Sequence, residues 1–387
     1  MSGRRTYVDI FTRLINNANE DDEDFDPIPD YSFHDLNLKF NFDLSSKDKL
    51  FVSSYYGRDF FRFQGDGFDF NFDWGNTSLT FRWNHIFSPK LFSNTTATIS
   101  DYNYLIQNEL QNVASFELGS GIRDYNVKTD FFYSPTNQHN IRFGIGATFH
   151  QFEIGRLEGG DEEGTFSFEA GQNFTASEFA AYLSDDFEVN DRIKLMAGLR
   201  FSGFQNNEFY AAIEPRFSSR FSLSDKVSLK ASYTHMAQFI HLVSNSAISL
   251  PTDLWYPSDQ VVAPQRSNQI AAGAVWSISD DLLFSSEAYY KWSNNQVDFR
   301  DGADLFINDE LNEEFVFGDG WSYGNEWYLE KTKGKLTGWA GYTLSWARRQ
   351  FDEINEGKSF APRFDTRHDI SLVAIWELNR RLSFTAT

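Results

Sequence analysis

Apolar and polar residues alternate along most of this chain with a period of two. Between Ile141 and Phe149 the odd positions are apolar, whereas the even positions carry polar residues or glycine. The same alternation runs through residues 35–44, 192–202, 282–292 and 336–346. Because successive side chains of a strand point to opposite faces, this period predicts β-strands with one apolar face. We find no convincing helical period and expect an all-β chain.

The predicted strands are long. About sixteen such segments can be counted, and many run for roughly 10 to 16 residues. Strands of soluble proteins are usually about five to six residues long, whereas a strand that crosses a membrane needs roughly nine to eleven. The lengths therefore favour the wall of a transmembrane barrel. No Pro/Ser-rich linker divides the chain, so we expect residues 1–387 to form a single outer-membrane β-barrel domain.

The connections between the predicted strands are alternately short and long. Short polar turns lie at residues 45–48, 88–90, 135–138, 189–191, 224–226, 279–281, 333–335 and 379–381. Long connections are expected at residues 103–115, 155–172, 240–264, 300–321 and 352–364, with two shorter ones near Gly65 and Asn206. Short periplasmic turns that alternate with long external loops are typical of an antiparallel up-and-down barrel in the outer membrane.

Aromatic residues gather toward the ends of the predicted strands. Tyr133, Phe187, Phe221, Trp276 and Trp376 lie near short turns, and we place Trp83, Trp292, Trp346 and Phe351 at the opposite ends. In a membrane barrel, one belt of aromatic residues is expected at each membrane interface, with an aliphatic band between the two belts. We therefore assign the aromatic surplus to the lipid-facing side and expect a polar lumen on the other. Aromatics in the core of a soluble sandwich are the alternative interpretation.

Composition removes several other classes of protein. The 387 residues include 68 aromatics (41 Phe, 17 Tyr and 10 Trp) and no Cys, so a disulfide scaffold and a thiolate metal site are excluded. The net charge of -21 makes nucleic acid an unlikely partner. The mean hydropathy of -0.47 would by itself suggest a soluble protein. Alternation explains this value, because only every second residue of a barrel strand faces lipid.

Five stretches stand out by their order and spacing, although none is specific alone. They are residues 214–217 with 228–239, 253–258, 264–269, 324–345 and 362–369, which read EPRF with SLKASYTHMAQF, DLWYPS, PQRSNQ, GNEWYLEK leading into LTGWAGYTLS, and PRFDTRHD. Together they resemble the β-barrel of TonB-dependent outer-membrane receptors of the Bacteroidetes type. The resemblance extends from Gly3 to the end of the chain.

This resemblance implies a 22-stranded barrel in the outer membrane, filled by an N-terminal plug domain. About 16–17 of the strands are expected here, with residues 2–7 in an early strand, and with the plug domain and the last strands outside this chain. The implied function is TonB-dependent uptake of a scarce nutrient, such as a siderophore, cobalamin, a glycan or a peptide. The implied partners are outer-membrane lipid and lipopolysaccharide, the plug domain, a TonB-type energy transducer and the nutrient ligand.

Two other functions stay open at this point. One is a passive porin or a structural outer-membrane barrel, and the other is a secreted soluble all-β protein that binds carbohydrate. Catalysis finds no support, because the chain has no G-x-S-x-G elbow and its seven His residues form no HxxxH or HExxH pattern. His235 and His241 are six residues apart, which suits no metal site. We therefore predict no enzyme, no cofactor and no metal site.

Candidate substrate-binding residues lie in the predicted external loops. They are Asp253, Trp255, Tyr256, Trp321, Tyr323 and Arg363. The aromatic rings are suited to stacking on a sugar or a siderophore, or else to packing the loop on itself, and Arg363 is suited to an anionic ligand or to a neighbouring acid. Acidic runs at residues 21–24, 161–163 and 309–314 would keep the loops soluble, or bind divalent cations that bridge to lipopolysaccharide.

Overall fold

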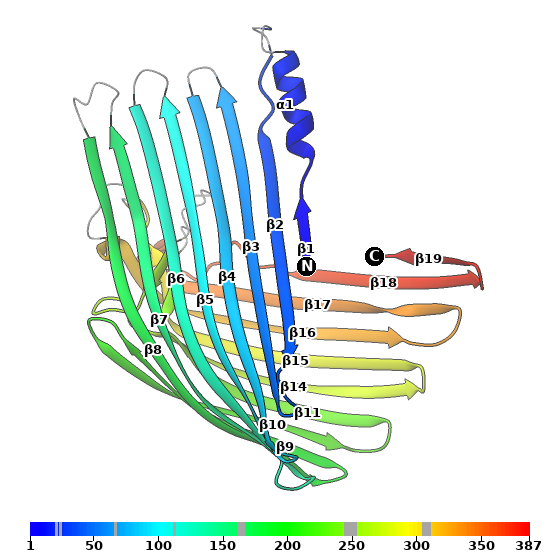
Figure 1. The fold of residues 1–387 in the computed structure, drawn as a ribbon. Helices are drawn as coiled ribbons and strands as arrows, with labels where there is room; N and C mark the ends of the chain where they lie inside the picture. The colour runs from blue at the N-terminus through cyan, green and yellow to red at the C-terminus, as the bar shows by residue number, and fades with distance from the viewer. Residues whose placement is uncertain are drawn as a thin grey trace.

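A computed structural model of the chain shows one antiparallel sheet of 17 strands and a separate two-stranded hairpin. The structure describes residues 1–19, 22, 25–65, 68–110, 114–160, 167–243, 254–303 and 311–387. In the large sheet, each strand pairs with the next one along the chain, and only the hairpin strands β12 and β13 are passed over. This is the predicted up-and-down arrangement, and 17 strands agree with the 16–17 that were expected. Figure 1 shows the sheet wrapping around a concave side.

The strands of the large sheet differ widely in length. Their bounds are β1 Ser2–Arg5, β2 Asp30–Asp43, β3 Asp48–Gly65, β4 Phe68–Ser88, β5 Leu91–Leu110, β6 Ala114–Tyr133, β7 His139–Gly160, β8 Ser167–Asn190, β9 Ile193–Gln205, β10 Phe209–Ser222, β11 Val227–Gln238, β14 Gln265–Ser279, β15 Leu282–Phe299, β16 Phe315–Lys331, β17 Leu336–Phe351, β18 His368–Asn379 and β19 Leu382–Ala386. The hairpin strands are β12 Ile240–Val243 and β13 Leu254–Pro257, and short 3-10 turns cover Leu311–Glu314 and Asn355–Gly357.

All eight predicted short turns lie between consecutive strands at one end of the sheet. Two of the predicted long loops are wrong, however. Residues 103–115 are mostly strand, because β5 continues to Leu110 and β6 begins at Ala114, and β7 and β8 likewise extend into 155–172. In β5 the successive residues Tyr104 and Leu105 are both apolar, although they lie on opposite faces of the strand. The alternation of apolar and polar residues is therefore lost there. The long connections after residues 238 and 351 are confirmed, whereas the one predicted for 300–321 is shorter, because β16 begins at Phe315.

The longest strands exceed what a bilayer requires. β8 has 24 residues, which at about 3.3 Å per residue is roughly 80 Å of strand. A tilted strand needs only roughly nine to eleven residues to cross the hydrocarbon core of about 30 Å. The strands therefore project far beyond the bilayer on the side of the long connections, and that projecting part forms the wall of an outer mouth.

One α-helix contradicts the expectation of an all-strand chain. β1 ends at Arg5, and α1 then covers Val8–Ala18, so the early strand predicted for residues 2–7 is shorter than expected. Polar residues of α1 face the first residue of β2: Thr12 Oγ1 donates to Asp30 at 2.5 Å and Arg13 Nε donates to the same carboxylate at 2.7 Å. Its apolar side, with Phe11 and Leu14, is exposed. None of the helices in the described ranges is long and apolar enough to span a membrane.

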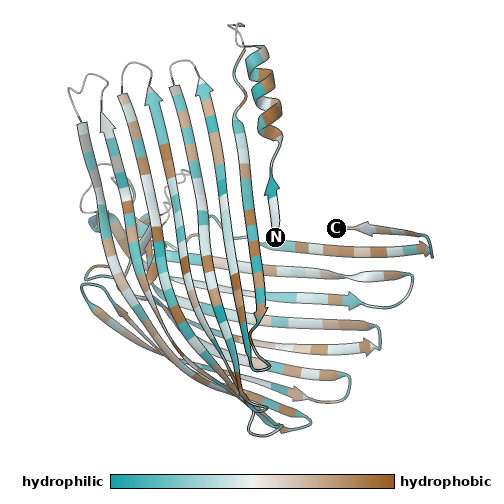
Figure 2. Ribbon diagram, viewed as in Figure 1, coloured by the Kyte–Doolittle hydropathy of each residue, from teal (hydrophilic) through white to brown (hydrophobic). Residues whose placement is uncertain are grey.

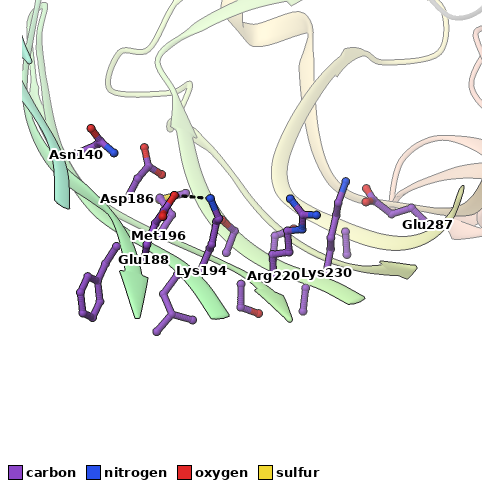
Figure 3. A pocket seen from close by; sticks show the side chains of 15 residues that line it. Asn140, Asp186, Glu188, Lys194, Met196, Arg220, Lys230 and Glu287 are labelled. Atoms are coloured by element: carbon purple, nitrogen blue, oxygen red, sulfur yellow. Dashed lines mark hydrogen bonds and ion pairs between the residues drawn. The ribbon is translucent and has the colours of Figure 1, made fainter. Parts of the chain in front are cut away.

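The two faces of the sheet differ in polarity near the short turns. We call the concave side the inner face; it carries Asp186, Lys194 and Arg220, whose side chains point into the hollow in Figure 3. The opposite, outer face carries apolar rows, and the alternation is visible along the ribbons of Figure 2. Trp276 and Trp376, which precede two short turns, are each 48% exposed on the sheet, as an interfacial ring requires.

Two aromatic placements are corrected. Trp83 lies at the short-turn end rather than the loop end, because it pairs with Leu50 and its Nε1 donates to Asp48 at 3.1 Å. Phe351 is not lipid-facing: it is buried in a small cluster with Val316 and Ile354. The turn after β17 folds back over the Phe351 ring. The position of Phe351 in the sequence does not show this contact.

Candidate functional site at the outer mouth

The connection between β11 and β14 folds back as the β12–β13 hairpin, which is the main feature of the outer mouth. Residues Ile240–Val243 pair with Leu254–Pro257 in this hairpin. β13 contacts β6 and β7, whereas β12 contacts β15. Because β7 and β15 are far apart in the order of the sheet, the hairpin crosses the concave side and connects two parts of the wall.

A hydrophobic core surrounds the hairpin. Its buried members are Phe152, Ile154, Ala176, Phe204, Ala212, Phe239, Val243, Leu254, Tyr256, Val262, Val297, Phe299 and Phe315. Tyr256 is 1% exposed, and its ring meets Phe174 and Phe315 edge-on, with centroids 5.6 Å and 5.0 Å away. Phe174 belongs to β8 and Phe315 to β16, so a single ring from the hairpin is packed between two walls.

Asp259 fixes the chain that follows the hairpin. Its carboxylate accepts the Tyr256 hydroxyl at 2.7 Å and the backbone N–H groups of Val261 and Val262 at 2.9 and 2.8 Å. Tyr210 of β10 donates to the Asp259 carbonyl at 2.6 Å. Burial, together with the hydrogen bond to Asp259, raises the pKa of Tyr256 well above its usual value. The phenol is therefore a permanent hydrogen-bond donor that anchors the hairpin.

His241 and Ser258 form a buried pair beside Asp259. His241 is 1% exposed, and its Nε2 lies 3.0 Å from the Ser258 hydroxyl, while its Nδ1 has no hydrogen-bond partner among the described residues. Burial lowers the pKa of His241 to about 4, which leaves the ring neutral. A Ser-His-Asp triad would need the carboxylate on Nδ1 and an accessible serine. Here Asp259 accepts from Tyr256, and Ser258 is fully buried.

A cavity of about 640 Å³ opens beside the hairpin. It is lined by Gln172, Asn173, Phe174, Asn207, Tyr256, Asp259, Gln260, Val261, Asn312 and Glu313. Five of these ten residues are amides, which offer both donors and acceptors, and none is Lys, Arg or His. A neutral or cationic polar ligand therefore fits this lining better than an anionic one.

An aromatic cluster covers the inner face of the projecting parts of β4–β6. Tyr104, Ile106 and Leu118 are its buried members, with Phe70, Phe72, Trp74, Tyr102 and Phe116 packed against them. Phe72 stacks on Trp74 with centroids 4.5 Å apart, and Tyr31 stacks on Trp74 at 6.4 Å. This cluster was missed because we assigned the aromatic surplus to the lipid side. The signal was present in β4, where Ser78 and Thr80 share a face with Trp74.

Nearer the short turns, the inner face becomes polar and charged, as predicted for a lumen. A shallow cavity of about 410 Å³ lies against β7–β11 and β14–β15 and is shown in Figure 3. Lys194 forms an ion pair with Glu188, and Arg142 forms one with Asp186 at 3.2 Å. Among the described residues, no group of three or more His, Asp or Glu is placed to hold a metal ion.

The six predicted ligand residues do not form one site. Tyr256 lines the cavity and Trp255 packs against the hairpin core, whereas Asp253 lies outside the described residues. Trp321 and Tyr323 were expected to end a loop, but both lie within β16. Tyr323 is 39% exposed on the outer face and stacks between Tyr290 and Trp346, at 6.4 and 5.2 Å. Arg363 is exposed on the connection between β17 and β18.

Comparison with known families decides what kind of barrel this is. The family model described as "TonB dependent receptor-like, beta-barrel" matches residues 6–380. The chain belongs to this family. It is therefore an outer-membrane barrel, and the resemblance seen in the sequence is confirmed at the level of the family. No curated protein sequence matches the chain significantly.

Three solved receptor structures share the fold. The ferric-catecholate import receptor Fiu from E. coli K12 superposes with a TM-score of 0.63 at 11% identity, and the match covers 92% of this chain and 63% of that one. For the ferripyoverdine receptor of Pseudomonas aeruginosa the TM-score is 0.64 at 13% identity, covering 92% and 54%. For the ferric preacinetobactin receptor BauA of Acinetobacter baumannii it is 0.61 at 12%, covering 90% and 59%. The chain thus spans between half and two thirds of the length of these receptors.

Proposed function

We propose that this barrel belongs to an active-transport receptor that takes up a scarce nutrient through the outer membrane. Family membership supports this, and so does the hairpin core at the outer mouth. A passive pore needs an unobstructed mouth, whereas here Tyr256 and its neighbours place a packed hairpin across the concave side. Transport past such an obstruction requires a rearrangement, and an energy-transducing partner of the TonB type would drive it.

We infer that the ligand is bound first in the cavity beside the hairpin. The lining of amides and two carboxylates, without a cationic side chain, favours a neutral or cationic ligand that forms many hydrogen bonds. Among the nutrients implied by the family resemblance, a glycan or a peptide meets this description better than an anionic ferric siderophore. The aromatic cluster around Trp74 offers ring faces for such a ligand farther along the inner wall.

The remaining parts of this proposal concern partners. A plug domain encoded outside residues 1–387 would occupy the polar lumen, and the apolar outer face would contact outer-membrane lipid and lipopolysaccharide. The Bacteroidetes-type resemblance of the sequence suggests the group of bacteria to which the receptor belongs. We propose a binding and transport role without catalysis, because Ser258 is buried and His241 Nδ1 has no hydrogen-bond partner among the described residues, so the two do not form a working triad.

Uptake by cells that produce the protein tests the proposal. Labelled oligosaccharides and oligopeptides would be supplied before and after the proton motive force is collapsed with an uncoupler. We expect accumulation of one ligand class that stops when the force is collapsed. Accumulation that is unchanged by the uncoupler would indicate a passive porin instead.

Variants in the cavity test the ligand site separately. Asn173→Ala combined with Asn312→Ala should weaken binding of that ligand by roughly tenfold or more, because each loses hydrogen bonds to a polar ligand. Asn41→Ala is the matched control, since Asn41 lies in β2 near the short turns, far from the cavity. Equal effects of the double variant and the control would argue against this cavity.

A further inference from the structure

Two cationic side chains lie directly opposite each other on the inner face, near the short turns. Arg220 of β10 and Lys230 of β11 are a register pair, and both line the cavity of Figure 3. Like charges at directly opposed positions of a sheet destabilise it. Neither side chain forms an ion pair with another residue in the described part of the chain. The pair is unexpected because the chain has 55 acidic and only 34 basic residues.

The neighbouring charges do not compensate this pair. Residues that are register partners across successive strands form one row on the inner face. In this row Lys194 of β9 is the partner of Arg220 on the side away from Lys230, and it already forms an ion pair with Glu188. Beyond Lys230 the row continues with Gly273, which has no side chain, and then with Glu287. Glu287 is two strand spacings from Lys230, roughly 10 Å, and forms no ion pair with it.

Two hydroxyl groups complete the arrangement. Ser218 and Ser232 are the register pair two residues farther along the same strands, on the same face, and line the same cavity. Neither hydroxyl forms a side-chain hydrogen bond with another described residue. A guanidinium, an ammonium and two hydroxyls therefore share one side of one cavity, and all can donate. Such a set matches an oxyanion, because phosphate and carboxylate oxygens only accept when they are ionised.

We propose that Ser218, Arg220, Lys230 and Ser232 form an oxyanion-binding site on the lumenal wall. The oxyanion is either a dissolved anion in the lumen or a side-chain carboxylate of a polypeptide that occupies it. Because the site faces the lumen near the short turns, it is separate from the cavity at the outer mouth. Its existence does not depend on the proposed uptake of a nutrient.

Equilibrium dialysis of the full chain in detergent micelles, with radiolabelled inorganic phosphate at low ionic strength, tests the site. We expect R220Q and K230Q each to weaken phosphate binding roughly tenfold, since each removes a charge-assisted donor. E287Q should strengthen binding a few-fold, because it removes a carboxylate that lines the same cavity and repels an anion. R82Q is the matched control: Arg82 lies in β4 and does not line this cavity, so phosphate binding should stay the same.

Absence of phosphate binding to the unmodified chain, or equal weakening by R82Q and R220Q, would overturn the proposal. R220K retains the charge and should bind with intermediate affinity, which separates loss of the site from loss of the fold. A short oligoglutamate peptide identifies the source of the oxyanion. Its displacement of phosphate from the unmodified chain would indicate a polypeptide carboxylate, and failure to displace it would indicate a dissolved anion.

Discussion

Tyr256 of the hairpin meets Phe315 of β16 edge-on, with ring centroids 5.0 Å apart. This contact connects the hairpin to a wall strand that begins 59 residues after Tyr256 in the chain. Phe174 meets the same tyrosine from β8 at 5.6 Å. The hairpin is consequently held across the mouth by a ring between two walls rather than by its own four-residue strands, since an isolated two-stranded hairpin is marginally stable at best.

Tyr256→Ala should therefore release the hairpin. Removing a large buried aromatic ring lowers stability by about 3–5 kcal/mol. Because Tyr256 contacts both walls, we expect this loss to weaken the docking of the hairpin. Hydrogen exchange of peptides covering residues 254–262 should become much faster, while the strands keep their protection. Tyr323→Ala removes a ring on the outer face and serves as the control. Unchanged protection of residues 254–262 in the Tyr256 variant would show that other contacts hold the hairpin.

The stability of the hairpin should depend on pH through His241. Burial lowers the pKa of this ring from its usual value of 6.5 to about 4, so the docked hairpin takes up no proton between pH 6.5 and pH 4, whereas the released hairpin does. The docked state is therefore fully stable above about pH 6.5 and loses stability as pH falls toward 4, by about 1.4 kcal/mol per unit at most. Limited proteolysis after β13 should accelerate between pH 7 and pH 5.

His241→Gln removes the titrating group from the same position. In this variant, the cleavage rate should show a flatter dependence on pH than in the unmodified protein, measured with a protease whose own activity is corrected at each pH. Parallel pH profiles for the two proteins would assign the change to another group.

Asp30→Ala should unfold α1. The Asp30 carboxylate accepts from both Thr12 and Arg13, and an isolated helix of 11 residues is too short to be stable in water. Hydrogen exchange over residues 8–18 should approach the rate of an unstructured peptide. Asp26→Ala changes an exposed acid in the connection between α1 and β2 and should leave the helix protected. If α1 stayed protected without Asp30, its exposed apolar side would have to be covered by something else.

The Arg349–Asp298 pair should be sensitive to loss of either partner. Asp298 is fully buried, and Arg349 Nη1 donates to it at 3.2 Å. Arg349→Met leaves a buried carboxylate without this cation, which typically costs 3–5 kcal/mol. The double variant with Asp298→Asn should recover much of that loss in thermal unfolding. A double variant no more stable than Arg349→Met alone would show that the ion pair is not the cause.

The sequence by itself determined the wall of this barrel. A period of two, together with polar turns such as Ser224–Lys226, defined the strands and the end of the sheet at which they turn. This succeeds because the bilayer imposes one rule, apolar outside and polar inside, on every residue that spans it.

Only the tertiary structure decided what happens beyond the bilayer. There both faces of a strand meet water or protein, so alternation no longer tells which face is inner. Trp74 and Tyr104 consequently face inward although we assigned aromatics to the lipid side. Tyr256 could be named as a candidate, but its place between β8 and β16 depends on contacts distant in the chain. Alternation along one strand carries no information about such contacts.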